Sequence, residues 1–78
     1  MTTLDQVPVG RTARVRGVRG EDDISLRLME MGLTPGVELT VMGVALWGDP
    51  LELEVRGYRL SVRRSEASRV DVETDAAA

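Results

Sequence analysis

The sequence predicts a small, mainly β domain, a barrel of short strands with one short helix near its beginning. Segments in which apolar and polar residues alternate recur along the chain and end at glycine or proline, as half-buried strands do. One early segment has helical spacing instead. The apolar residues are mostly aliphatic, with Trp47 and Tyr58 as the only aromatics, and branched aliphatic side chains suit the interior of a narrow barrel.

The length of 78 residues predicts a single domain over residues 1–78. Because the chain has no cysteine, the fold must rest on packing, which fits a reducing compartment. No segment has the ~20 apolar residues that a membrane span needs. The N-terminal residues lack the basic start and apolar run of a signal peptide. We therefore expect a cytoplasmic protein with no direct membrane insertion.

The first long strand and the helix follow one another. Residues 12–18 alternate between apolar and polar, which predicts a strand. Acidic residues 21–23 then precede apolar residues spaced by four and three positions. This pattern predicts a helix over residues 23–31 whose free N–H groups are capped by a carboxylate. Gly32 stands where a left-handed residue commonly ends a helix.

Three further strands follow in the second half of the chain. Pro35-Gly36 fits the centre of a type II turn, and residues 37–42 alternate after it. Residues 51–56 and 58–62 alternate around Arg56-Gly57, which predicts a hairpin with a two-residue turn. In this register the apolar residues share one face, whereas a slip of one residue would separate them. The predicted pairs are Val55–Tyr58, Glu54–Arg59, Leu53–Leu60, Glu52–Ser61 and Leu51–Val62, and Tyr58 is expected to face the core.

The last part of the chain predicts a single helical turn over residues 65–68 and a short closing strand at Val70 and Val72. We expect the packed core to span about residues 4–73 and residues 74–78 to form a frayed tail. Five strands with one short helix after the first strand favour an SH3-like five-stranded barrel. A five-stranded oligonucleotide-binding barrel is the alternative, but such barrels usually place their helix between the third and fourth strands.

The residue types that catalysis and tight metal binding need are missing. The chain has no histidine and no cysteine, so the usual nucleophile–base pairs and the ligands typical of zinc and iron are absent. A phosphate-binding loop needs a lysine, which the chain also lacks. Glu52 and Glu54 share one strand face, but a solvated surface pair is a far commoner arrangement than a paired-carboxylate site. We expect no catalytic residue, no cofactor and no metal site.

The charge argues against nucleic acid as a partner. The net charge is −3 and the isoelectric point is about 4.8, whereas phosphate backbones attract a positive face. The cluster Arg11, Arg14, Arg16 and Arg19 supports the alternative of a nucleic-acid-linked regulatory barrel. Such charge runs are usually solvated faces, so we expect no nucleic-acid partner.

A protein partner is the remaining class of ligand. Met29 and Met42 fall on outward positions, and Trp47 lies in a turn; tryptophan and methionine are enriched in interface cores. A second interpretation, in which Trp47 folds back to plug one end of the barrel, is equally open. We expect a partner to contact Met29, Glu30, Leu46 and Trp47.

Several segments resemble a known family. Residues 27–36 read RLMEMGLTPG, and residues 48–52 read GDPLE. Together with Val9-Gly10, Gly57, Leu60, Arg63, Glu66 and Ala67, they resemble the FeoA family, the small cytoplasmic partners of the bacterial ferrous iron transporter. The resemblance runs from about residue 4 to residue 72. Leu46, followed by Trp47, stands where the family pattern leads us to expect a proline.

The resemblance implies an SH3-like barrel with a non-enzymatic adaptor role in ferrous iron uptake. It also implies binding to the cytoplasmic GTP-binding portion of the membrane transporter, which would recruit the chain to the inner face of the membrane. Similar barrels are domains of metal-dependent repressors, so a related regulatory domain is the alternative. Without histidine and cysteine we expect no tight ferrous site, and an open barrel edge would permit weak self-association.

Overall fold

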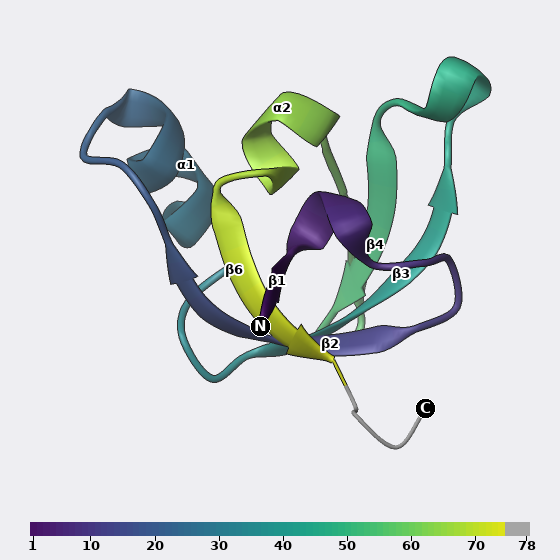
Figure 1. The fold of residues 1–78 in the computed structure, drawn as a ribbon, viewed down its shortest axis with the longest axis horizontal. Helices are drawn as coiled ribbons and strands as arrows, with labels where there is room; N and C mark the ends of the chain where they lie inside the picture. Colours follow the sequence, from purple (N-terminus) through teal and green to yellow (C-terminus); the bar gives the residue numbers. More distant parts are fainter. Residues whose placement is uncertain (75–78) are drawn as a thin grey trace.

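The computed structural model describes residues 1–74, which form one curled antiparallel sheet with helices gathered at one end (Figure 1). The strands lie in the order β1-β6-β2-β3-β4-β5. In sequence the elements are β1 (Thr2–Thr3), the 3-10 helix η1 (Leu4–Gln6), β2 (Thr12–Val18), α1 (Asp23–Glu30), β3 (Glu38–Val44), the 3-10 helix η2 (Leu46–Gly48), β4 (Leu51–Val55), β5 (Tyr58–Val62), α2 (Arg64–Ala67) and β6 (Val70–Thr74).

The mainly β, SH3-like class is confirmed, but the strand count of five is wrong. A sixth strand, β1, pairs with β6 through Thr2↔Val72 and Thr3↔Asp71. Two threonines are too short a segment to show alternation, so the sequence pattern could not reveal this strand. The helix consequently follows the second strand. Thr74 belongs to β6 rather than to the predicted tail, whose remaining residues 75–78 lie outside the described part of the chain.

Helix α1 has the predicted cap at each end. The Asp22 carboxylate accepts a hydrogen bond from the Ser25 amide at 3.2 Å. At the other end Gly32 has φ +113°, and the amides of Gly32 and Leu33 donate to the carbonyls of Met29 and Leu28. This pair of bonds is the Schellman motif, which satisfies carbonyls that a helix end otherwise leaves free. The helix ends one residue before the predicted boundary.

The β4–β5 hairpin has the predicted register in all five pairs. Arg56 and Gly57 have φ +51° and +85°, which are the two positive values of a type I′ turn. Such a turn matches the right-handed twist of the strands, and this match accounts for the tolerance of an arginine where asparagine is usual.

The expected position of Tyr58 in the core is wrong. Its side chain is 43% exposed, because the ring lies toward the C-terminal end of α1 and the hydroxyl donates to the Met31 carbonyl at 2.6 Å. A phenol needs a polar partner when it packs against protein, and a fully inward ring would have none. Tyr58 therefore connects the start of β5 to the end of α1.

The core is aliphatic throughout. Within residues 1–74 every fully buried large side chain is leucine or valine. The buried apolar residues are Leu4, Val7, Ala13, Val15, Leu28, Leu33, Val37, Leu39, Val41, Leu51, Leu53, Val55, Val62, Ala67, Val70 and Val72. In the same part of the chain, no helix has the length and apolar character to cross a membrane.

Candidate interaction surface

The turn between β3 and β4 carries two of the most exposed apolar side chains of the described chain. Leu46 is 82% exposed and Trp47 is 99% exposed. The turn is closed by hydrogen bonds from the Ala45 amide to the Pro50 carbonyl at 2.9 Å and from the Gly48 amide to the Ala45 carbonyl at 3.0 Å. We call residues 45–50 the tryptophan turn.

The backbone of Trp47 is strained. Its φ is +67°, a left-handed conformation that bulky residues rarely adopt. Such a conformation costs on the order of 1–3 kcal/mol and persists only where surrounding contacts impose it. The full exposure of the indole also excludes the interpretation of Trp47 as a plug of the barrel.

Arg64, the first residue of α2, contacts the turn through both its side chain and its backbone. Its Nε donates to the Gly48 carbonyl at 2.6 Å, and its backbone amide donates to Asp49 Oδ1 at 3.0 Å. Its Nη1 reaches the Asp5 carbonyl at 3.0 Å. Arg64 thus joins the tryptophan turn, α2 and η1, and it holds the base of the turn while the tip projects into solvent.

The other half of the predicted surface lies on α1. Met29 is 36% exposed and Glu30 is exposed as well. The helix is attached to the rest of the fold by ion pairs at both ends, Asp22–Arg69 at 2.6 Å and Arg27–Glu66.

The first of these pairs shifts the pKa of Asp22. The hydrogen bond from Arg69, assisted by the one from the Ser25 amide, holds the pKa of the Asp22 carboxyl well below its usual range. Asp22 therefore stays ionised as both helix cap and ion-pair partner at neutral pH.

The two halves of the surface lie at the same end of the molecule but apart from each other. In Figure 1, α1 and the tryptophan turn stand on opposite sides of α2. A groove of about 430 Å³ lies between elements of both halves, and Met29, Glu30, Leu46 and Trp47 do not line it. Its lining residues are Arg27, Met31, Asp49, Pro50, Ser61, Arg63 and Glu66. Sequence reasoning missed this groove because its walls come from four separate segments.

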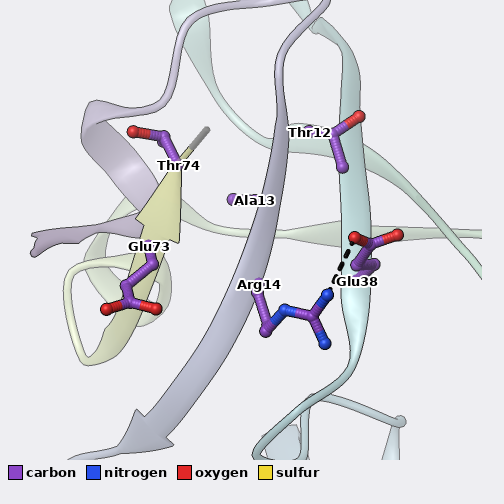
Figure 2. A pocket seen from close by; sticks show the side chains of 6 residues that line it. All are labelled: Thr12, Ala13, Arg14, Glu38, Glu73 and Thr74. Atoms are coloured by element: carbon purple, nitrogen blue, oxygen red, sulfur yellow. Dashed lines mark hydrogen bonds and ion pairs between the residues drawn. The ribbon is translucent and has the colours of Figure 1, made fainter. Parts of the chain in front are cut away.

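The arginines of β2 are paired with carboxylates. Arg14 contacts Glu38 on β3 at 3.2 Å, whereas Arg16 contacts Glu73 on β6 at 3.4 Å. Figure 2 shows Arg14 and Glu38 pointing toward one another, with Glu73 on the other side of β2. The shallow pocket there, about 260 Å³, is lined by Thr12, Ala13, Arg14, Glu38, Glu73 and Thr74. This is the solvated strand face that the sequence predicts.

The remaining polar candidates do not converge. Glu52 and Glu54 are exposed and face Ser61 and Arg59 across the hairpin. Across residues 1–74, no three acidic side chains gather closely enough to hold a metal ion.

Comparison with known proteins decides the family. The FeoA domain family matches residues 2–74, almost the whole chain. The chain belongs to the FeoA family. This confirms the resemblance that the RLMEMGLTPG run indicates.

Relatives of this FeoA domain agree in sequence and in fold. It is similar to a fusion of Fe(2+) transport protein A with the Fe(2+) transporter FeoB in Porphyromonas gingivalis, with 31% identity over 70 residues. The match covers 90% of this chain and 8% of that protein. The NMR structure of a FeoA-like protein from Clostridium acetobutylicum is 37% identical, with a TM-score of 0.87 and coverage of 94% of this chain and 85% of the other.

A crystal structure of Stenotrophomonas maltophilia FeoA complexed with zinc is also similar, with 34% identity, a TM-score of 0.80 and coverage of 99% and 93% of the two chains. That protein is named an SH3 domain protein. The structure of the manganese regulator SloR shares the fold, with a TM-score of 0.81, 22% identity and coverage of 95% of this chain and 34% of the other. That likeness shows the fold alone.

Proposed function

We propose that this FeoA domain is a non-enzymatic, cytoplasmic accessory protein of ferrous iron uptake that binds the GTP-binding portion of the membrane transporter. Membership of the FeoA family supports the role in iron uptake. In the relative from Porphyromonas gingivalis, FeoA and FeoB are parts of one protein. Parts that function together in one chain commonly associate when they are separate, and this reasoning supplies the partner.

One observation supports contact rather than chemistry as the mode of action: the exposed Leu46–Trp47 tip of a turn whose base is fixed by Arg64. A rigid aromatic side chain loses little conformational freedom on binding, so it can anchor an interface. Met29 and Glu30 on α1 form the second, smaller area of the proposed contact surface.

The experiment is a pull-down of the transporter's GTP-binding portion by the full chain, with and without guanine nucleotide. We expect the wild-type chain to retain the partner. Trp47→Ala should weaken binding by more than ~1 kcal/mol, about fivefold or more, because interface anchors lose at least this much on truncation. Isothermal titration with purified proteins would give the affinity.

Met42→Ala is the matched control for this variant. Met42 is an apolar residue on β3, 40% exposed, that lies outside the proposed surface, so its truncation should leave the affinity unchanged. Equal effects of the two variants would reject the tryptophan turn as the contact. Absence of binding by the wild-type chain, together with unchanged iron uptake in a deletion strain, would reject the function itself.

The chemistry of the side chains leads to a second test. Ferrous iron bound tightly by proteins commonly has imidazole or thiolate ligands, and the chain has neither. We propose that iron is the cargo of the partner and is not held tightly by this chain. Anaerobic calorimetry with Fe²⁺ should show no one-to-one binding in the micromolar range; such binding would contradict the proposal.

A further inference from the structure

Among residues 1–74, strand β5 lies at the edge of the sheet and has β4 as its only neighbouring strand. In a hairpin with a two-residue turn, Val55 and Tyr58 exchange hydrogen bonds, and so do Leu53–Leu60 and Leu51–Val62. The alternate residues, Arg59 and Ser61, therefore direct their N–H and C=O groups away from β4. No residue within 1–74 forms a hydrogen bond with these outward groups, and both residues are exposed.

The arginines around this edge lack carboxylate partners. Within residues 1–74, five of the ten arginines form ion pairs, namely Arg14, Arg16, Arg19, Arg27 and Arg69. Four of the other five lie between residues 56 and 64. Arg59 lies on the outward face of β5 with Ser61, because side chains on one face of a strand alternate. Arg63 directly follows the end of the strand as the N-cap residue of α2.

Acidic groups are also present near this edge, but they are further away or already bonded. Glu52 and Glu54 belong to β4, so they lie two strand spacings, roughly 9–10 Å, from any strand added beyond β5. Asp49 accepts a hydrogen bond from the Arg64 amide. Glu66 is paired with Arg27 and accepts from the Arg63 amide. The nearest unpartnered charges at the edge are therefore positive.

The groove beside the edge can receive side chains. Ser61 and Arg63 form one of its walls, and Arg27 and Met31 of α1 form another. Met31 is only partly buried, as is Leu60 on the inward face of β5. A residue placed opposite Leu60 in an added strand would point inward and cover these two side chains.

We propose that the β5 edge is a docking site for an extended segment of a protein partner in which acidic and apolar residues alternate. The segment adds one strand to the sheet and pairs its backbone with Arg59 and Ser61. Its acidic side chains lie beside Arg59 and Arg63, so that Glu54, Arg59 and the new carboxylate form a ladder of alternating charge. Its apolar side chains point to the inward side of the edge, toward the partly buried Leu60 and Met31. This surface is separate from the tryptophan turn and goes beyond the proposed function.

A second copy of the chain fits this edge poorly. Antiparallel pairing of two β5 strands about a twofold axis at Ser61 would place Arg59 of one copy opposite Arg63 of the other. Like charges directly opposite one another in a sheet are destabilising. In that register, charge complementarity favours an acidic segment over a second copy.

The test uses the full chain labelled with ¹⁵N and a blocked synthetic peptide, Glu-Val-Glu-Val-Glu-Val-Glu. Strand addition should slow hydrogen exchange of the Arg59 and Ser61 amides at least tenfold and leave the exchange rate of the Leu60 amide, which already donates to β4, nearly unchanged. A peptide with lysine in place of glutamate should bind at least tenfold more weakly. Equal binding of the two peptides, or an absence of protection at Arg59 and Ser61, would overturn the proposal.

The matched variants are Ser61→Pro and Ser61→Ala. Proline removes only an N–H that faces solvent, which an edge strand tolerates, so the sheet should persist while peptide affinity falls at least tenfold. Alanine keeps the N–H and should bind normally. A second experiment does not depend on the folding of the proline variant. The wild-type chain is mixed with a peptide that is N-methylated at its central residues, and binding should again be lost. Normal binding of that methylated peptide would overturn the proposal.

The charge component is tested separately with Arg59→Gln and Arg11→Gln. Both remove one arginine without an ion pair among residues 1–74, but Arg11 precedes β2, outside the β5 edge and its groove. Only Arg59→Gln should lower the affinity for the acidic peptide, by about three- to tenfold, and reduce the salt dependence of that binding. Equal effects would show non-specific charge attraction and reject the docking site. Concentration-dependent dimerisation that competes with the peptide would assign the edge to a second copy instead.

Discussion

Two segments of the chain are rich in arginine, and the fold uses them differently. Residues 11–19 contain β2, where Arg14, Arg16 and Arg19 each pair with a carboxylate of a neighbouring strand. Residues 56–64 contain β5, where the arginines have no carboxylate within ion-pair distance among the described residues. There Arg64 instead binds backbone carbonyls.

The difference follows from the position of each strand in the sheet. Strand β2 lies between β6 and β3, and both neighbours present acidic residues beside its arginines. Among residues 1–74, strand β5 has one neighbour, β4, whose Glu54 lies opposite Arg59 without ion-pair contact, and one free edge. Local sequence does not distinguish the two segments, since both alternate arginine with apolar or small residues. Topology decides which charges are neutralised within the domain and which remain available to another molecule.

The largest effect on stability should come from Arg64→Ala. The change removes charge-assisted hydrogen bonds to the Gly48 and Asp5 carbonyls, and bonds of this kind contribute about 1.5–3 kcal/mol each in favourable cases. Because Arg64 is exposed, we expect a loss of about 2 kcal/mol in the free energy of unfolding. Urea unfolding followed by circular dichroism measures this loss. Tryptophan fluorescence is less suitable, because Trp47 is already exposed in the native state and its emission would change little on unfolding.

Arg56→Ala serves as the control for that prediction. Arg56 belongs to the same segment but makes no hydrogen bond through its side chain in the described structure. Its variant should differ from wild type by no more than about 0.5 kcal/mol, as is usual for surface positions. If the two variants are equally unstable, the anchoring role of Arg64 is wrong.

An intermediate effect on stability is expected at acid pH from Asp22. Its ion pair with Arg69 joins the start of α1 to the segment that follows α2. The folded-state pKa of this carboxyl lies below its ordinary value of 3.8. The pair therefore contributes its full stability above that value, and the contribution is lost as the pH falls through the folded pKa. Urea midpoints at pH 6 and pH 3 should show a smaller drop for Asp22→Asn than for wild type.

Asp23→Asn is the neighbouring comparison. Asp23 lies in the first turn of α1, but its side chain forms no hydrogen bond or ion pair with the described residues. Its variant should keep the wild-type dependence on pH. A wild-type pH profile in Asp22→Asn would show that the Arg69 contact does not contribute to stability.

The smallest effect separates the paired from the unpaired strand arginines. A double-mutant cycle with Arg14→Gln and Glu38→Gln should give a coupling energy of about 0.2–1 kcal/mol that decreases with salt. The same cycle at Arg59 and Glu54, which are opposite in the register but not in ion-pair contact, should give a coupling near zero. Equal couplings would remove the distinction between the two segments.

Local patterns predicted much of the fold. Alternation and turn chemistry placed β2, β3, β4 and β5, and the register of the β4–β5 hairpin followed from the pairing of its apolar faces. The cap at Asp22 and the end at Gly32 set the limits of α1 to within one residue. These features depend on residues that are close in the sequence, so a single sequence was enough to predict them.

What the sequence could not predict depends on contacts between distant segments. Strand β1 is defined only by its pairing with β6, and the position of Tyr58 by the Met31 carbonyl. The link from Arg64 to Asp5 and Gly48 spans most of the chain. All four predicted contact residues are exposed, namely Leu46, Trp47, Met29 and Glu30. Their role stays a prediction, and the groove between α1 and β5 had no local signal.

The pairing of β1 with β6 also affects how the domain can be connected to other proteins. Thr2 lies opposite Val72, so the first and last strands are hydrogen-bonded neighbours (Figure 1). Adjacent ends favour circular permutation and insertion into a host loop. A permuted chain could join residues 1 and 74 by a short glycine-rich connector and open at the exposed Pro35-Gly36 turn. The domain is therefore a compact module that another protein could carry on two closely spaced attachment points.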